Sequence, residues 1–234
     1  MAATHVPWPA PGWCTNGSLG IRRGFASPLP EGYQPALRRR SVWPATPLIG
    51  VISRLTDQKG FDLVASALED MLALGIQYVL LGTGERRYNE LFPELAKHHP
   101  RAFAIKIAYD NALAHLMEAG ADMFLMPSLY EPCGLNQLYS LRYGTVPIVR
   151  AVGGLEDTIS DDPRHPNTNT GFKFQEYSAE AMLQAIARAR TAYDRKTSWL
   201  SMVRRCMKQD FSWEASARAY VEIYQKAMQR HGLR

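Results

Sequence analysis

The chain has 234 residues, of which 46% are hydrophobic and 21% are charged, and this composition is typical of a folded globular protein. Its length provides enough core for one large domain or two small ones. No run of about 18 apolar residues occurs, so the sequence predicts no membrane-spanning helix. The three cysteines are widely spaced and form no CxxC pair, which argues against a disulfide framework or a zinc site and fits a reducing compartment.

The net charge of +5 is concentrated near the N-terminus. Residues 1–46 contain five arginines and a single acidic residue, Glu31, whereas the rest of the chain is nearly neutral. The sequence therefore gives no indication of nucleic-acid binding. The same segment holds seven of the fifteen prolines, so we predict an irregular or disordered segment over 1–46. Its Arg-rich, acid-poor composition fits either an organelle transit peptide or a remnant of an interdomain region.

The first regular element is a buried strand over Leu48–Arg54, which is apolar and rich in β-branched residues. A loop with two cations, Arg54 and Lys59, follows the strand, and apolar residues then recur at helical spacing from Phe61 to Gly75. Such cations are often no more than solvated surface charges. An arginine and a lysine that converge from one loop also suit the spread negative charge of a diphosphate.

The second unit begins with a strand over Tyr78–Leu81. We predict that this strand ends in a glycine turn that lets the backbone approach a ligand closely, formed by Gly82, Thr83 and Gly84. A helix containing Leu91 and Leu95 follows the turn.

The third unit is a strand over Phe103–Tyr109 followed by a helix that ends at Gly120, with Asp110 as its N-cap. Tyr109 ends the strand on the side where ligands bind in α/β sheets, so it is either a core aromatic or a ligand contact. His115 lies inside the helix, where a packing role and a ligand contact are both open.

A carboxylate stands at the carboxyl end of the next strand, Met123–Met126. Glu131 follows this strand, and Gly134 and Leu135 lie at the start of a helix that ends at Gly144. Ligands bind at such strand ends, and a helix N-terminus offers free N–H groups to an anion. The sequence thus predicts a ligand site here, and a merely solvated Glu131 is the alternative.

The remainder of the chain repeats the strand–helix pattern. A strand over Val146–Arg150 leads to Gly153 and Gly154, which open a helix, and a polar surface loop over 163–170 precedes a strand over Thr170–Phe174. Three further helices are predicted over Ala179–Tyr193, Ser198–Lys208 and Ser212–Met228. Within the last of them we predict core packing for Trp213, Tyr220 and Tyr224.

Strands thus alternate with helices about six times, and every polar motif follows the carboxyl end of a strand. This pattern predicts an α/β fold, a Rossmann-like doubly wound parallel sheet of about six strands.

Three motifs at these strand ends resemble those of bacterial glycogen synthases and plant starch synthases. They are SRLTDQKG at residues 53–60, SLYEPCGLNQLYSLRYG at 128–144 and GGLEDT at 153–158. These enzymes have two Rossmann-like domains that face each other across a cleft, the GT-B arrangement. The resemblance runs from Pro47 to about Met228 and matches only the second, nucleotide-sugar-binding domain. It implies a donor-binding domain over 47–234, after the irregular segment 1–46.

The resemblance implies transfer of glucose from ADP-glucose to an α-1,4-glucan with retention of configuration. Arg54 and Lys59 would neutralise the diphosphate, Glu131 would hold the sugar hydroxyls, and Tyr109 would lie against adenine. Further donor contacts are implied for Gly82, Thr83, Gly84, Cys133, Gly134, Leu135, Gly153 and Gly154. No metal or cofactor is implied, since the chain has no Asp-x-Asp motif and no His/Cys cluster. The residues alone do not distinguish ADP- from UDP-glucose.

One departure from the family concerns its first domain, which supplies a KTGG loop, a sugar-contacting histidine and the acceptor groove. This chain has a single Gly-Gly pair, Gly153-Gly154, and no such loop. We therefore expect the isolated chain to bind ADP weakly and to transfer little or no glucose. Another nucleotide-sugar transferase and a non-catalytic nucleotide-binding module are the alternatives. The family implies a cytoplasmic location, or a plastid location for a plant protein.

Overall fold

Strands alternate with helices in the computed structural model, which describes residues 46–230. The predicted irregular segment 1–46 lies outside the described residues, except for Thr46. The strands are β1 (Leu48–Leu55), β2 (Gln77–Gly84), β3 (Phe103–Ile107), β4 (Met123–Met126), β5 (Val146–Arg150) and β6 (Phe172–Phe174). The helices are α3 (Phe61–Ala73), α4 (Arg86–His98), α5 (Asn111–Gly120), α6 (Asn136–Tyr143), α7 (Gly154–Thr158), α8 (Ala179–Asp194), α9 (Lys196–Met207) and α10 (Trp213–Arg230), with short 3-10 turns η4 (Asp57–Lys59) and η5 (Pro166–Thr168).

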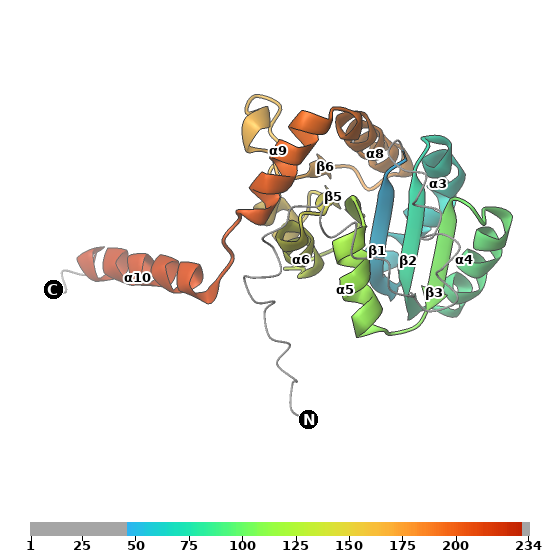
Figure 1. The fold of residues 1–234 in the computed structure, drawn as a ribbon. Coiled ribbons are helices and arrows are strands. Elements are labelled where there is room, and N and C mark those ends of the chain that lie inside the picture. Colours follow the sequence, from blue (N-terminus) through green and yellow to red (C-terminus); the bar gives the residue numbers. More distant parts are fainter. Residues whose placement is uncertain (1–45, 231–234) are drawn as a thin grey trace.

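The strands over residues 46–230 form one parallel sheet with the order β3-β2-β1-β4-β5-β6 (Figure 1). This order confirms the predicted doubly wound, Rossmann-like fold. The chain builds outward from β1 to β3, returns to β4 on the other side of β1, and builds outward again to β6. The order therefore reverses between β1 and β4, and in open α/β sheets a ligand crevice lies at the carboxyl ends of such a strand pair.

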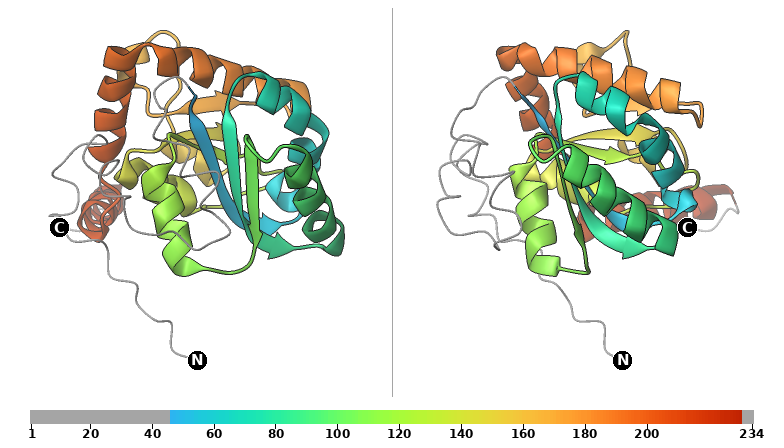
Figure 2. Two further views of the ribbon diagram at one scale, coloured as in Figure 1. Left: turned by 45° about the vertical axis from the view of Figure 1, so that its right-hand side comes forward. Right: turned by 90° about the vertical axis from the view of Figure 1, so that its right-hand side faces the viewer.

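The buried parts of the central strands, Leu48–Val51 of β1 and Tyr78–Leu81 of β2, contain almost only apolar side chains, and helices cover both faces of the sheet. Alternate residues of a strand point to opposite faces. Ile49 and Leu80 belong to the larger core, which α3 and α4 cover, whereas Leu48 and Val79 belong to a smaller core under α5. Figure 2 shows α5 on one side of the sheet and α3 and α4 on the other. Two-sided burial explains why the sequence shows continuous apolar runs instead of a polar–apolar alternation.

Local sequence signals set the ends of the helices. Asp110 caps α5 as predicted, since its Oδ1 accepts from Leu113 N at 2.9 Å. Ser178 caps α8 in the same way, with its Oγ 3.2 Å from Ala181 N. Gly144 ends α6 in the left-handed region at φ 77°, where glycine carries no steric penalty.

The predicted glycine turn after Leu81 is wrong, because Gly82, Thr83 and Gly84 continue strand β2. They pair in register with the last three residues of β1, Ser53, Arg54 and Leu55. A Cβ on Gly82 would lie 1.9 Å from the Ser53 carbonyl oxygen, and one on Gly84 would lie 2.2 Å from that of Leu55. The glycines are therefore needed for the close approach of two strands.

The segment predicted as a polar surface loop, 163–170, is exposed only in part. Asn169 and Thr170 are buried, and their side chains accept hydrogen bonds from Asp162 N at 2.8 Å and Ser160 N at 3.0 Å. These hydrogen bonds give the buried polar side chains partners for their oxygen atoms. Strand β6 begins two residues later than predicted, at Phe172.

The prediction of core packing for Trp213, Tyr220 and Tyr224 is also wrong. All three side chains are exposed, and α10 buries none of its residues. Figure 1 shows α10 extending away from the sheet and its covering helices. Apolar spacing along a helix identifies a face that can pack, but it does not identify the partner. None of the helices over residues 46–230 is long and apolar enough to cross a membrane.

Candidate functional site

A cavity of about 350 Å³ lies at the point where the strand order reverses. Its walls come from the carboxyl-terminal halves of β1 and β4 and from the loops that follow these strands. The polar residues among those lining it are Ser53, Lys59, Ser128, Glu131 and Asn136. The topology therefore brings Lys59 and Glu131, which are far apart in sequence, to one crevice.

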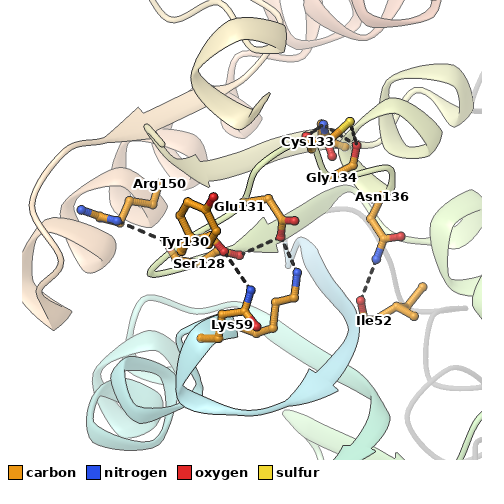
Figure 3. Close-up of polar contacts among 11 residues, drawn as sticks. Ile52, Lys59, Ser128, Tyr130, Glu131, Cys133, Gly134, Asn136 and Arg150 are labelled. Atoms are coloured by element: carbon orange, nitrogen blue, oxygen red, sulfur yellow. Dashed lines mark hydrogen bonds and ion pairs between the residues drawn. The ribbon is translucent and has the colours of Figure 1, made fainter. Parts of the chain in front are cut away.

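Lys59 and Glu131 form an ion pair in this cavity, with Nζ 2.5 Å from Oε2 (Figure 3). Their side chains are 20% and 8% exposed, and Ser128 Oγ also donates to Glu131 Oε2 at 3.3 Å. Pairing lowers the cost of holding a carboxylate away from water. An ammonium group has three N–H donors, so Lys59 can keep this contact and still bind an anion.

The loop that carries Glu131 is held by two glycines at the start of α7, the N-cap Gly153 and the first helical residue Gly154. Gly154 N donates to Glu131 O at 3.1 Å. A Cβ on Gly153, whose φ is 49°, would lie 2.2 Å from Glu131 O, and one on Gly154 would lie 2.1 Å from Cys133 O. These predicted donor contacts are therefore packed against the backbone of the Glu131 loop, and they are not among the residues that line this cavity.

The N-terminus of α6 faces the same cavity through Gly134, Leu135 and Asn136. Gly134 has φ 73°, and the buried Gln137 side chain donates to its carbonyl oxygen at 3.1 Å. Asn136 Nδ2 donates to Ile52 O at 2.7 Å, which ties the start of α6 to β1 (Figure 3). The thiol of Cys133 is exposed beside this turn.

A second cavity of about 360 Å³ adjoins the first, with Ile52, Ser53 and Asn136 common to both. It is lined by the predicted site residues Arg54, Gly82, Thr83 and Tyr109, together with side chains of α5 and α6. The structure therefore divides the predicted residues between two cavities, with Lys59, Glu131, Gly134 and Leu135 in the first. Gly84 lines neither of these two cavities; its N–H donates to Asn89 Oδ1 at 3.1 Å.

Tyr109 is 91% exposed, which excludes the core role that the sequence left open. Strand β3 ends at Ile107, so Tyr109 belongs to the loop before α5, and its ring lies at the wall of the second cavity. His115, on α5, contacts the Tyr143 hydroxyl through Nδ1 at 3.1 Å in the same cavity. An exposed aromatic ring at a cavity wall suits stacking with a planar ligand group.

Glu118 is a buried carboxyl group on the wall of the second cavity that the sequence pattern did not single out. It is 3% exposed, its Oε2 accepts from Ser140 Oγ at 2.7 Å, and its Oε1 has no hydrogen-bond partner within residues 46–230. Burial raises the pKa of Glu118 to about 8, so the group is mostly protonated at neutral pH. Glu118 lies within the ordinary alternation of apolar and polar residues along α5, so the sequence did not indicate a buried carboxyl group here.

The sequence also did not predict four side chains that make long-range contacts. Gln58, Arg150 and Tyr177 contact the loops that carry Lys59 or Glu131, and Asn136 joins the start of α6 to β1. Each forms a contact with a residue distant in sequence, so the pattern around it carries no information about the partner. Among residues 46–230, no three or more His, Cys, Asp or Glu side chains gather as a candidate metal site.

Comparison with known proteins places this geometry in a family. The sequence profile described as "Glycosyl transferases group 1" matches residues 34–199. Glycogen synthases from Koribacter versatilis and Anaeromyxobacter sp. are 52% and 53% identical over 183 and 181 residues, which are 78% and 77% of this chain. In both comparisons the chain spans 38% of the relative's length.

A solved structure shows the same fold. The catalytic domain of starch synthase IV from Arabidopsis thaliana, bound to ADP and acarbose, has a TM-score of 0.73 and is 32% identical. The alignment covers 91% of this chain and 42% of that one. With the sheet order, the crevice between β1 and β4 and the profile match in agreement, the chain belongs to the group 1 glycosyl transferases and corresponds to the C-terminal domain of the GT-B arrangement.

Proposed function

We propose that residues 47–234 form the donor-binding domain of an ADP-glucose:1,4-α-glucan glucosyltransferase that retains configuration, a glycogen or starch synthase. The observation that carries this proposal is the Lys59–Glu131 pair, 2.5 Å apart in the cavity at the reversal of strand order. The pair places a cation for the diphosphate beside a carboxylate for the sugar. The identity to glycogen synthases and the ADP-bound starch synthase support the choice of donor.

The chemistry follows from the charges in the two cavities. Transfer breaks the bond between the anomeric carbon and a diphosphate oxygen, and ADP leaves with the electron pair of that bond. A hydroxyl oxygen of the glucan forms the new bond to the anomeric carbon, and its proton passes to the departing diphosphate. Lys59 and Arg54 stabilise the negative charge that develops on ADP, and N–H groups at the start of α6 bind phosphate oxygens. Glu131 accepts hydrogen bonds from the sugar hydroxyls and stabilises positive charge on the ring.

The second cavity accommodates the nucleoside in this proposal. Tyr109 provides an exposed ring for the base, and the backbone of Gly82 and Thr83 lies on the same wall. The glucan acceptor binds in the part of the relatives that this chain does not cover, so we expect the chain alone to transfer little or no glucose. Metals and cofactors take no part in this scheme, and the proposed location is cytoplasmic, or plastid for a plant protein.

A thermal melt with ADP, UDP, GDP or no nucleotide tests this function. A ligand at 100 times its dissociation constant adds roughly 2.7 kcal/mol to the free energy of unfolding. We expect ADP to raise the melting temperature and Lys59→Ala to reduce the rise strongly. Lys97→Ala is the matched control, since it removes a lysine whose exposed side chain pairs with Glu94 on α4.

Each outcome of the melt separates the candidate functions. A rise with UDP or GDP but not ADP would indicate a different nucleotide-sugar transferase. No rise with any nucleotide at millimolar concentration would contradict donor binding by this chain. A rise with ADP that is equally large in Lys59→Ala would support a nucleotide-binding module in which Lys59 does not bind the diphosphate.

A further inference from the structure

The two charged groups of the site stand on separate loops. Lys59 belongs to η4 and Glu131 follows β4, 72 residues later. Direct contacts between these loops involve Gln58, whose carbonyl accepts from Leu129 N at 2.9 Å and whose side-chain amide donates to Tyr130 O at 3.3 Å. These contacts join the two loops through Gln58. The opposite side of η4 is held by other residues.

Arg150, the last residue of β5, holds the Glu131 loop from outside the cavity. Its Nη1 donates to Leu129 O at 2.8 Å and lies 3.4 Å from Ser128 O (Figure 3). Its Nε donates to Gln175 O at 3.1 Å, in the segment that joins β6 to α8. The guanidinium carbon also lies 5.3 Å from the centre of the Tyr177 ring, a cation–π distance. Arg150 therefore connects the Glu131 loop to Tyr177.

Tyr177 continues this connection to the turn that carries Lys59. Its hydroxyl oxygen lies 2.5 Å from Asp62 Oδ1 and 3.0 Å from Asp57 O, so a single proton is shared between two acceptors. Burial, together with the nearby Asp62 carboxylate, raises the pKa of Tyr177, which keeps the hydroxyl protonated as a donor. Asp57 is the first residue of η4, and its carboxylate is also held by Arg87 and Tyr88.

We propose that Arg150 and Tyr177, which we name the Arg150–Tyr177 link, are positioning residues. They fix η4 relative to the Glu131 loop, so that Lys59 Nζ stays within reach of both Glu131 and the donor diphosphate. Neither side chain lines the two cavities described above, so both act through Lys59. The part of this inference that concerns ADP rests on the proposed function, whereas the part that concerns the Lys59–Glu131 pair does not.

A ligand-free measurement tests the link on the whole chain. Side-chain ammonium signals of lysine appear in ¹⁵N-correlated NMR spectra only when an ion pair or hydrogen bond slows proton exchange. We expect a Lys59 signal in the unmodified chain and its loss in Glu131→Gln, Tyr177→Phe and Arg150→Met. Arg150→Lys keeps the positive charge but not the planar guanidinium group, so we expect the Lys59 signal to be lost in this variant as well.

Two control variants match these substitutions. Tyr78→Phe removes a buried tyrosine hydroxyl that has no hydrogen-bond partner in the part of the chain that the structure describes, and Arg86→Met removes an exposed arginine paired with Glu90. Both should keep the Lys59 signal. A Lys59 signal that persists in Tyr177→Phe and Arg150→Met would overturn the inference, whatever the nucleotide experiments show.

An affinity comparison tests the consequence for the donor. The Tyr177 hydroxyl reaches η4 through the Asp57 carbonyl oxygen, and loss of one such neutral hydrogen bond corresponds to roughly a fivefold change in affinity, about 1 kcal/mol. We expect Tyr177→Phe to weaken ADP binding by about this factor while adenosine binding stays unchanged, because adenosine lacks the groups that Lys59 binds. In a Lys59→Ala background, Tyr177→Phe should have no further effect on ADP.

The outcomes distinguish this inference from the proposed function. Equal weakening of ADP and adenosine, or equal weakening with and without Lys59, would show a general structural role and overturn the inference. If the unmodified chain does not bind ADP, the proposed function fails, and the NMR comparison alone decides whether the link positions Lys59.

Discussion

Gly60 shows how closely single residues are fitted around the site. It follows Lys59 directly and has φ 78°, in the left-handed region. A Cβ at this position would lie 2.1 Å from the Pro127 carbonyl oxygen, in the loop that leads to Glu131. Because the obstructing atom belongs to the backbone, no side-chain rotation can relieve the contact. Gly60 thus allows the Lys59 turn and the Glu131 loop to touch.

We expect Gly60→Ala to lower the free energy of unfolding by about 2–4 kcal/mol, from left-handed strain plus the backbone collision. Gly75→Ala is the matched control, because Gly75 also has a positive φ, 72°, but a Cβ at this position would meet no atom within 4 Å. It should cost about 1 kcal/mol, from the conformational term alone. Urea unfolding of both variants measures the difference. Equal losses would show that the Pro127 contact is not a constraint.

The site residues could be predicted individually, but their pairing could not. Arg54, Lys59 and Glu131 stand at strand ends, where the sequence pattern already indicates a ligand site. That Lys59 contacts Glu131, while Arg54 lines the adjoining cavity, depends on the reversal of strand order between β1 and β4. Gly153 and Gly154 were predicted as donor contacts, and the structure packs them against the Glu131 loop, a role set by a backbone distance that no local pattern encodes.

At the scale of elements, α5 and α6 are joined by polar groups inside the protein. Glu118 of α5 accepts from Ser140 of α6, and Thr145 Oγ1 donates to the Glu118 carbonyl oxygen. A protonated carboxyl group satisfies this site better than a charged one, because no cation lies against Oε1 among the described residues. The contact between the two helices therefore depends on the protonation state of one side chain.

Because the Glu118 carboxyl group is protonated in the folded protein, we expect the free energy of unfolding to depend on pH. The pKa of Glu118 is raised from 4.5 to about 8 in the folded protein. Its stabilising contribution is fully present below about pH 4.5 and falls as pH rises toward about 8, by up to about 1.4 kcal/mol per pH unit. Glu118→Gln cannot ionise, so the difference in unfolding free energy between the two proteins should shift in favour of the variant over this range.

Urea titrations of the unmodified chain and Glu118→Gln at about pH 5, 6, 7 and 8 measure this difference, with pH values chosen to span the range set by the shifted pKa. Ser66→Ala serves as a remote control, since Ser66 Oγ donates to Leu63 O in its own helix and carries no titratable group. Parallel stability curves for the unmodified chain and Glu118→Gln would contradict the shift.

The elements themselves followed from the sequence where burial and caps agree. Continuous apolar runs predicted the strands. Asp110 predicted the start of α5 and Gly144 the end of α6, and the structure confirms both helix ends. Strand β2 runs past its predicted end because glycines, usually a turn signal, here permit close pairing with β1. Such an exception depends on the neighbouring strand, so sequence periodicity could not reveal it.

At the scale of the molecule, α10 stands apart from the folded body (Figure 1). Its aromatic residues Trp213, Tyr220 and Tyr224 are exposed, and the rings of Tyr220 and Tyr224 lie 6.3 Å apart. The preceding helix is different, because α9 buries Trp199, Val203 and Cys206 in the core. The folded body therefore ends, in terms of packing, with α9.

Deletion of residues 213–234 should accordingly leave the melting temperature almost unchanged, since little apolar surface is exposed by the cut. Deletion of residues 196–234 also removes α9 and should prevent cooperative unfolding or lower the melting temperature strongly. Circular dichroism melts of both truncated chains make the comparison. A large loss on removal of α10 alone would show that this helix packs against the body in solution.

The position of the crevice also bears on how the protein folds. Strands β1 and β4 meet through short pairing at Ile49 and Gly50, and the Asp122 carboxylate that accepts from Leu48 N lies 74 residues along the chain. Closing so long a loop carries an entropic cost that local hairpins and helices avoid. Strand pairing within the β1–β3 half and within the β4–β6 half joins residues that are closer in sequence than those joined at this seam. Lys59 belongs to one half and Glu131 to the other, so the ligand site comes into being only when the halves join, and a ligand held between them opposes their separation.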